Sequence, residues 1–436
     1  MAIKYGTPGA TELLSDYMFT ATKQDSLMVN KLTGPLPKGG MKKALAGQRV
    51  YSRRNAPIVE CYDLQAKGGS NIRFNLRGPV FGKPYKGQET FQGKGKKMPW
   101  DKAVLTLGFT SFPVFAGSTV DQQVTTHDLY YNAKDAAIEW ATNYNTESCI
   151  VQMYGDRGYE TSMNWSIPLA SDPDFATIMD NEVLPPTRNR HYRASGDTVA
   201  RITNTAGVLD FTTTDVMTLR TIESIVTENN ESTYPVGGVK FVGDDQGAEE
   251  PLGLLWVSER VYDQIKKSGS SEIQEYQSNA LTRRSRPGQH SIFQRAPMLW
   301  KNCLVIIQPK PIRFYPGDAM TYCTSLTDTT TTTATVPTGA GWDNTRAIDR
   351  SVFIGAMALG KIIGGHDGSK YGIHKKLMGF LWSEEWDNHK TRLEVAAMMF
   401  NSYGKFRFTL DWGGVEQPTD YGVSVIDSVV ELPSLV

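Results

Sequence analysis

Two apolar-alternating segments bracket a long polar stretch in the first quarter of the chain. Ile72, Phe74 and Leu76 alternate with polar residues, the period-two pattern of a half-buried strand, and apolar residues resume at 104–107. The 78–102 stretch between them (GPVFGKPYKGQETFQGKGKKMPWDK) is rich in Gly and Lys and has too few apolar residues to fold on itself. Hairpin loops usually hold about two to five residues, and much longer ones are functional or disordered. The pattern predicts either a mobile surface loop or an extended loop that becomes ordered on a neighbouring chain.

The strongest helical pattern covers residues 119–154. Thr125 and Asp128 have the spacing of a capping box, and apolar residues then recur at steps of three and four. The stripe consists of Leu129, Ala133, Ala136, Ala137, Trp140, Ala141 and Tyr144. A helix of about thirty residues spans roughly 45 Å, which predicts a spine along an elongated molecule.

The remaining chain predicts helices and strands in coarse blocks. Helices are expected at 215–229, after the cap candidates Thr212 to Thr214, and at 259–268, after Ser258. We expect a buried strand at 298–308, a polar loop or exposed turn at 327–335, an apolar helix at 351–363, and late strands at 391–400, 405–410 and 421–432. Strands that follow helices suggest a return to the sheet begun near residue 104. The predicted fold class is α+β with an inserted domain.

Composition places the chain among globular proteins. Its 436 residues suggest two or three domains with a sizeable core. No apolar run reaches about eighteen residues, so we expect no membrane span, and the amino-terminal residues do not have a secretory-signal pattern. The four cysteines are far apart, which favours free thiols in a reducing compartment.

A net charge of zero conceals a strong asymmetry along the chain. Residues 1–110 hold 18 Lys and Arg against 7 Asp and Glu, whereas the rest hold 28 against 39. Such asymmetry suggests either a polyanion partner or self-association of a basic segment with an acidic body. The candidate contact residues are Lys38, Lys42, Lys43, Arg49, Arg53 and Arg54 in the amino-terminal segment, and Arg73, Arg77, Lys83, Lys86, Lys94, Lys96 and Lys97 in and beside the long loop.

The search for catalytic chemistry is mostly negative. Gly355 to Lys361 has the spacing of a phosphate-binding loop, but Ile362 stands where Ser or Thr is required. Glu384, Glu385, Asp387 and His389 form a polar cluster, with His366 and His374 upstream, yet their spacing matches no metal motif. We predict no catalytic residue, cofactor or metal. A hydrolase or metal-dependent enzyme that uses the 384–389 cluster is the alternative.

The order of several sequence blocks resembles the major capsid proteins of tailed bacteriophages. These blocks are KLTGPLPKG, then VECYDLQAKGGSNIRFNLRGPVFGKPYKGQETFQGKGKKMPWDKAVL, then THDLYYNAKDAAIEWATNYNTE with MYGDRG, and finally LWSEEWDNHKTRLEVAAMMFNSYGKFRF. The likeness runs from about residue 31 to the end. It is closest to the capsid family of the N-four-like podoviruses, which is similar in fold to the Hong Kong 97-type shell protein.

The resemblance implies a domain plan and a function. The plan is an amino-terminal arm (1–66), an extended β-hairpin loop (67–108), a peripheral domain with the spine helix (109–204, completed by 376–436) and an axial domain (205–375). The implied function is self-assembly through pentamers and hexamers into an icosahedral shell around double-stranded DNA, with the loop on a neighbouring subunit. Implied partners are other copies of the chain, weakly and non-specifically bound DNA, and scaffold, portal and cement or decoration proteins, with no membrane. Assembly is expected in the bacterial cytoplasm. Another virion structural protein is a further alternative.

Overall fold

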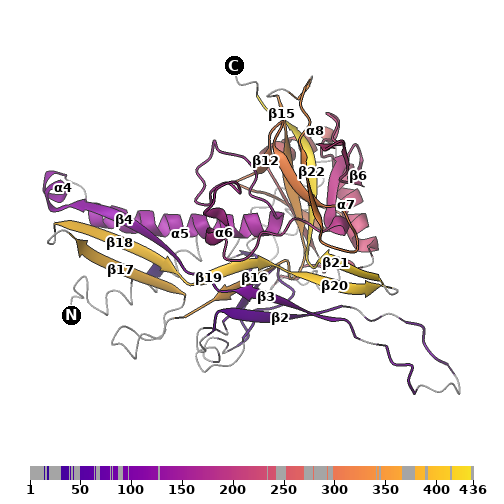
Figure 1. Ribbon diagram of the computed structural model, residues 1–436, viewed down its shortest axis with the longest axis horizontal. Coiled ribbons are helices and arrows are strands. Elements are labelled where there is room, and N and C mark those ends of the chain that lie inside the picture. Colours follow the sequence, from indigo (N-terminus) through magenta and orange to yellow (C-terminus); the bar gives the residue numbers. More distant parts are fainter. Residues whose placement is uncertain are drawn as a thin grey trace.

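The computed structural model in Figure 1 shows the long helix α5 along the molecule's longest axis, with sheets at both ends. It describes residues 14, 17–18, 31–38, 40, 43, 50–62, 64, 69–78, 80, 82–86, 92–96, 98–125, 128–232, 234–241, 252–269, 278, 292, 298–339, 341–342, 345–365, 379–387, 391–412 and 415–433. The helices are α4 (Thr119–Val124), α5 (Leu129–Tyr154), α6 (Phe175–Ile178), α7 (Leu219–Glu231) and α8 (Glu259–Ser268), with the 3-10 turn η2 (Arg188–Arg190).

The largest sheet holds eight strands in the order β10-β11-β9-β15-β22-β5-β6, with β12 paired to β15. These strands are β5 (His191–Ser195), β6 (Thr198–Arg201), β9 (Gly253–Val257), β10 (Met298–Trp300), β11 (Cys303–Ile307), β12 (Ile312–Phe314), β15 (Arg346–Ile354) and β22 (Val423–Glu431). The β15 and β22 strands pair antiparallel over nine residues and are buried almost throughout. They form the centre of the sheet.

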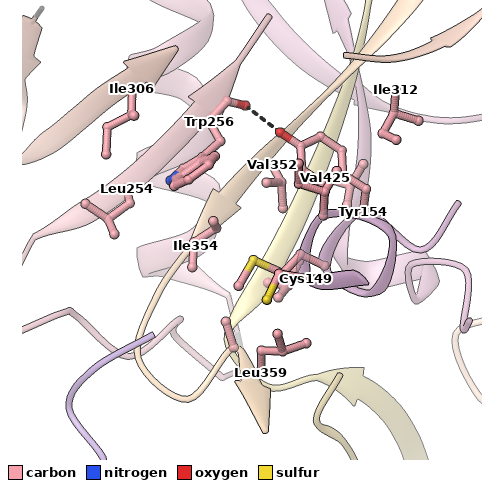
Figure 2. Close-up of a cluster of buried hydrophobic side chains, with 14 of the residues drawn as sticks. Cys149, Tyr154, Leu254, Trp256, Ile306, Ile312, Val352, Ile354, Leu359 and Val425 are labelled. Carbon is pink, nitrogen blue, oxygen red and sulfur yellow. Dashed lines mark hydrogen bonds between the residues drawn. The ribbon is translucent and has the colours of Figure 1, made fainter. Parts of the chain in front are cut away.

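The two faces of this sheet are covered by different elements. On one face the end of α5 brings Cys149 and Tyr154 against strand residues that include Trp256 (Figure 2). The Tyr154 hydroxyl lies 3.4 Å from the Trp256 carbonyl oxygen, to which it donates. On the other face α7 and α8 contribute Ile222, Ile225, Val261 and Ile265 to a second apolar cluster. The sheet therefore has a core on both sides, and one core includes the end of the long helix.

The opposite end of α5 packs on a three-stranded sheet. This sheet has the order β17-β18-β4 and consists of β4 (Thr110–Ser118), β17 (Phe380–Asp387) and β18 (Arg392–Met399). Ala133, Ala137 and Ala141 of the helix pack with Val395 and Ala397 of β18. Small residues on the buried stripe allow the helix to approach the sheet closely.

The predicted single helix over 119–154 is two helices. Ser118 caps α4, and the Asp128 side chain accepts a hydrogen bond from the Tyr131 N–H at the start of α5. Thr125 lies at the carboxyl end of α4 and does not cap α5. The long helix has 26 residues and spans about 39 Å, shorter than predicted. It ends at Gly155, which has a left-handed φ of 68° and which packs against the Leu184 carbonyl oxygen.

Smaller sheets complete the molecule. The hairpin of β2 (Asn71–Arg77) and β3 (Trp100–Thr106) confirms the alternating pattern, because Ile72, Phe74 and Leu76 are buried. Three further sheets are β1-β16-β19, β13-β14-β8-β7 and β20-β21. Their strands are β1 (Ile58–Cys61), β7 (Asn204–Thr205), β8 (Val208–Leu209), β13 (Ala319–Cys323), β14 (Thr331–Thr335), β16 (Leu359–Ile363), β19 (Asn401–Lys405), β20 (Arg407–Trp412) and β21 (Val415–Asp420).

The prediction of a helix at 351–363 is wrong. This segment contains the end of β15, a turn with left-handed Met357, and β16. Both strands are buried on both faces, so the sequence shows a continuous apolar run instead of alternation. Periodicity alone does not distinguish such a strand from a buried helix.

Three other local predictions need correction. The predicted strand at 298–308 is a hairpin of β10 and β11 that turns at Lys301 and Asn302, both with left-handed φ. The polar Thr run contains β14, which pairs antiparallel with β13 over five residues. Helix α7 starts at 219, later than predicted, because Thr218 is its cap while the Asp215 carboxylate accepts from the Thr212 N–H and Arg193. The cap prediction at Ser258 is confirmed.

The late strands are confirmed, and their pairing partners correct the expectation that this segment returns to the sheet begun near residue 104. Strand β18 pairs with β4, which begins at 110, and not with the strand near 104. Strand β22 lies between β15 and β5 in the eight-stranded sheet. The sheets therefore group 191–201 and 423–431 with 253–354, although the predicted plan places these two segments in the peripheral domain. The domain boundaries stay a prediction.

Candidate functional surfaces

The base of the long loop is fixed to the body. Buried residues of the hairpin, Phe74 and Leu105 among them, pack with Phe406 and Phe408. The Asp101 carboxylate accepts a hydrogen bond of 2.6 Å from the Thr409 N–H, and the Asn181 side chain bonds the Thr106 main chain. A two-stranded hairpin is marginal alone, so these contacts hold its direction.

The outward face of the hairpin is cationic and aromatic. Arg73 and Arg77 are exposed there, opposite Val104 and Trp100, and Lys102 lies between these two on β3. Trp100 is 61% exposed, an unusual position for a large aromatic ring. The predicted contact residues Arg73 and Arg77 thus lie on one fixed surface.

The loop beyond the hairpin extends away from the body, at the opposite end from β17 and β18 (Figure 1). Four predicted contact lysines are exposed in its described residues: Lys83, Lys86, Lys94 and Lys96. Lys94 Nζ lies 4.7 Å from the Tyr85 ring centroid, so the two runs of the loop contact each other. Lys97 lies outside the described residues.

The predicted arm is only partly described. Lys38, Lys43, Arg53 and Arg54 are exposed. The other two arm candidates, Lys42 and Arg49, lie outside the described residues. Residues 50–62 do not extend from the body: the Tyr62 N–H donates to the Val50 carbonyl oxygen, and Tyr51 contacts the Phe74 ring. This end of the predicted arm is part of the body, which corrects the expectation of an extended segment there.

The alternative enzymatic cluster is divided by the sheet. The Glu384 carboxylate faces α5 and accepts hydrogen bonds of 2.5 Å from the Tyr130 hydroxyl of α5 and 2.9 Å from the Trp382 indole N–H of β17. The neighbouring Glu385 is exposed on the other face of β17. Within the described ranges, which leave out His366, His374 and His389, no three His, Cys, Asp or Glu side chains are grouped to hold a metal.

Other residues singled out for chemistry have structural roles. Lys361, from the apparent phosphate motif, is buried in β16 and lies 3.3 Å from the Glu60 carboxylate. All four cysteines are free and buried, and burial raises the pKa of Cys149 to about 12. None of the described helices is long and apolar enough to cross a membrane.

Sequence analysis missed a buried charge cluster at the junction of α5 and the large sheet. Arg350 Nε and His191 Nε2 each lie 2.8 Å from the Asp427 carboxylate, and Arg350 also donates to the Tyr154 carbonyl oxygen. Burial favours the neutral acid, but Arg350 and His191 outweigh it, so the pKa of Asp427 lies below its ordinary value. Charged residues inside the apolar runs 346–354 and 423–431 were the available signal. The contacts of Arg350, His191 and Asp427 connect the end of α5 to the large sheet.

Comparisons with known proteins identify the fold and the family. The profile of the phage capsid protein family matches residues 2–432. Among solved structures, the capsid of Ralstonia phage GP4 superposes with a TM-score of 0.63 at 19% identity, over 87% of this chain and 89% of that chain. The cyanophage Pam1 capsid has a TM-score of 0.53 at 12% identity, with 86% and 89% covered. The head of Helicobacter pylori bacteriophage KHP40 has a TM-score of 0.51 at 10% identity, with 87% and 88% covered. The comparison with curated proteins returned no match.

These structural likenesses confirm the predicted phage capsid fold of the Hong Kong 97 type. Placement near the N-four-like group stays a prediction. Because the family profile spans nearly the whole chain, the protein belongs to the phage capsid protein family, as a major capsid protein of the head shell.

Proposed function

We propose that the chain assembles through pentameric and hexameric capsomers into an icosahedral shell around double-stranded DNA, without catalytic activity of its own. The observation that carries this proposal is the lysine-bearing loop, which leaves the body on a fixed hairpin. A loop of this length gains little by lying in solvent, whereas many copies that each make a modest contact stabilise a shell through multivalency.

The proposed division of labour follows the predicted domain plan. The peripheral domain (109–204 with 376–436) surrounds α5, the axial domain (205–375) points to the five- or six-fold centre, and the loop (67–108) overlies a neighbouring subunit. The arm (1–66) meets a neighbour or the genome. We further propose assembly in the host cytoplasm, with scaffold, portal and cement or decoration proteins as additional partners.

Charge reversal in the loop tests this proposal. Replacing Lys94, Lys96 and Lys97 by Glu should leave the subunit folded but block formation of shells, tubes or rings. Folding is checked by circular dichroism and assembly by size-exclusion chromatography and electron microscopy. The matched control replaces Lys266 and Lys267 of α8, which lie far from the loop in sequence, by Glu. Normal shells from the loop variant would exclude the proposed role of these lysines.

A further inference from the structure

A small cavity lies between α5, the end of α6 and β19, whose positions Figure 1 shows. Helix α5 contributes Tyr144, Ser148 and Gln152, which are spaced four residues apart and therefore share one face of the helix. Residues 178–180 and 401–403 complete the lining. The cavity has a volume of about 10 Å³, which is the space that one water molecule or one small ion occupies.

Two amide oxygens of this lining are buried without a hydrogen-bond donor. Gln152 and Asn401 are 1% and 2% exposed, and neither Gln152 Oε1 nor Asn401 Oδ1 has a partner in the part of the chain that the structure describes. The Gln152 Nε2 group donates to the Asn181 carbonyl oxygen over 2.8 Å. The Asn401 Nδ2 group donates to Asn145 Oδ1, also over 2.8 Å. These bonds fix the orientation of both amides, so each leaves a buried oxygen that needs a donor or a cation.

Three hydroxyl groups of the lining use their hydrogens in bonds to main-chain oxygens. The Ser148 hydroxyl donates to the Tyr144 carbonyl oxygen over 2.8 Å, and the Tyr144 hydroxyl donates to the Ile178 carbonyl oxygen over 2.9 Å. The Ser402 hydroxyl donates to the Thr106 carbonyl oxygen. Each hydroxyl therefore keeps only oxygen lone pairs for a further partner. A bound water needs donors to its own oxygen as well as acceptors, so this lining suits a cation better than water.

Asp180 adds one carboxylate to the lining. It is half-buried, so its negative charge lies beside the cavity while solvent keeps access to it. A single carboxylate among neutral oxygens balances one positive charge. Calcium sites gain affinity from several carboxylates, and Mg²⁺ keeps bound waters for which this cavity has no room. The lining therefore matches a monovalent cation.

We infer that the cavity binds one alkali metal cation, Na⁺ or K⁺, through oxygens of Asp180, Gln152 and Asn401. The cation holds α5, the turn after α6 and β19 together. Next to Asp180, the Asn181 side chain accepts from the Thr106 N–H over 2.8 Å and donates to the Thr106 carbonyl oxygen over 3.1 Å. The site thus lies at the root of the long loop. The inference concerns the single subunit and does not depend on shell formation.

Exchange of the cation in the buffer tests this site on the unassembled subunit. At constant ionic strength, replacement of about 100 mM tetramethylammonium chloride by KCl or NaCl should raise the thermal midpoint of unfolding by about 2–4 °C, because the ion binds only the folded subunit. The gain should saturate as the cation concentration rises. Tetramethylammonium carries the same charge but is too large for a cavity of this volume, so it controls for general salt effects.

Asp180→Asn removes the charge of the site and keeps the shape of the side chain. Its thermal midpoint should differ by less than about 1 °C among the three salts. In tetramethylammonium chloride this variant should be at least as stable as the unmodified subunit, because it lacks a half-buried carboxylate that has no cation there. The matched control Asp174→Asn changes an exposed acid of the same segment and should keep the full gain. Equal gains for Asp180→Asn and the unmodified subunit would overturn the inference.

Crystals of the subunit grown in RbCl locate the ion directly. Rubidium scatters X-rays anomalously, so a peak is expected in the cavity beside Asp180, Gln152 and Asn401. The peak should be absent from crystals of Asp180→Asn. An ordered water at this position without an anomalous peak, together with equal thermal midpoints in the three salts, would show that the cavity is a water site and that the inference is wrong.

Discussion

Asp180 holds a strained and half-buried position beside the root of the long loop. Its φ is 33°, and a Cβ atom added at Gly108 would lie 1.7 Å from its carboxylate oxygen. Gly108 lies between β3 and β4, so a side chain at this position would require the Asp180 carboxylate to move. Burial raises the pKa of Asp180 from its ordinary value of 3.8 to about 6. The connection between β3 and β4 therefore combines a close approach of the backbone at Gly108 with a carboxylate, Asp180, that is partly removed from water.

Because the pKa of Asp180 is raised, this residue makes the folded subunit less stable as the pH rises. The folded subunit binds this proton more tightly than the unfolded chain, so the stabilisation is complete below about pH 4 and is lost as the pH rises through about 6. Asp180→Asn should remove this dependence and raise the free energy of unfolding at pH 7.5 by about 1–2 kcal/mol, with less effect at pH 4.5. Asn tolerates the left-handed backbone.

Urea unfolding of the unassembled subunit at the two pH values measures this effect. Asp174→Asn is the control, since Asp174 is an exposed acid in the same segment. Equal gains for Asp180→Asn at both pH values would contradict the account. The sequence did not point to Asp180, because its burial is created by Gly108 and by segments distant in the chain.

At the scale of elements, helix α5 shows which features of a helix the local sequence pattern predicts and which it does not. The apolar stripe predicted the helix and most of its buried face, since Ala133, Ala137, Ala141 and Tyr144 are buried, whereas Ala136 of the stripe is exposed. Its predicted start at residue 119 was wrong because residues 119–124 form the separate helix α4, which has its own cap at Ser118. Only the structure shows that the chain is interrupted between α4 and α5.

Two alanine substitutions test the position of that start. Asp128→Ala should lower the free energy of unfolding by about 1 kcal/mol, because the Tyr131 N–H loses its side-chain acceptor. Thr125→Ala, the matched control, should change it by less than about 0.5 kcal/mol. Chemical denaturation of the subunit measures both. A larger loss for Thr125→Ala would indicate one continuous helix after all.

Strands buried on both faces were the main failure of prediction at this scale. The 351–363 run has a central place in two sheets, and its residues face apolar neighbours on either side. Amphipathic segments such as β2 and α8 were predicted well, because one of their faces meets water and leaves a period in the sequence. A strand that is buried on both faces has apolar residues at nearly every position, so its sequence shows no alternation of apolar and polar residues.

At the scale of the whole molecule, charge is segregated. The first 110 residues carry the excess of Lys and Arg, and the remainder carries an equal excess of Asp and Glu. Within the described residues, exposed Lys38, Arg53 and Arg54 offer contacts to phosphate, while the acidic body repels close packing of DNA. Long-range repulsion should therefore limit any genome contact to a weak one.

The isolated subunit should bind duplex DNA with a Kd weaker than about 1 µM at physiological salt and with strong salt dependence. Fluorescence anisotropy at about 50 and 150 mM salt measures both quantities. Replacing Lys38, Arg53 and Arg54 by Glu should weaken binding further, and Lys266→Glu with Lys267→Glu should have a smaller effect. Submicromolar binding at physiological salt would show that the acidic body does not limit the contact.

The sequence predicted the loop, the charge asymmetry and the resemblance to capsid proteins, but not which strands pair with one another. Glu385 and Glu394 are nine residues apart in the chain and become neighbours only through the register of β17 and β18. The buried cluster around Asp427 likewise depends on pairings between distant strands. Features made by tertiary pairing leave little local signal.

The position of β22 has a consequence for biosynthesis. This strand lies between β15 and β5, both of which leave the ribosome before it does. Until β22 is made, its two neighbours lack the strand that joins them, and Arg350 and His191 lack the Asp427 carboxylate. A nascent or prematurely terminated chain therefore cannot complete its largest sheet. The largest sheet is therefore complete only after translation has passed residue 431.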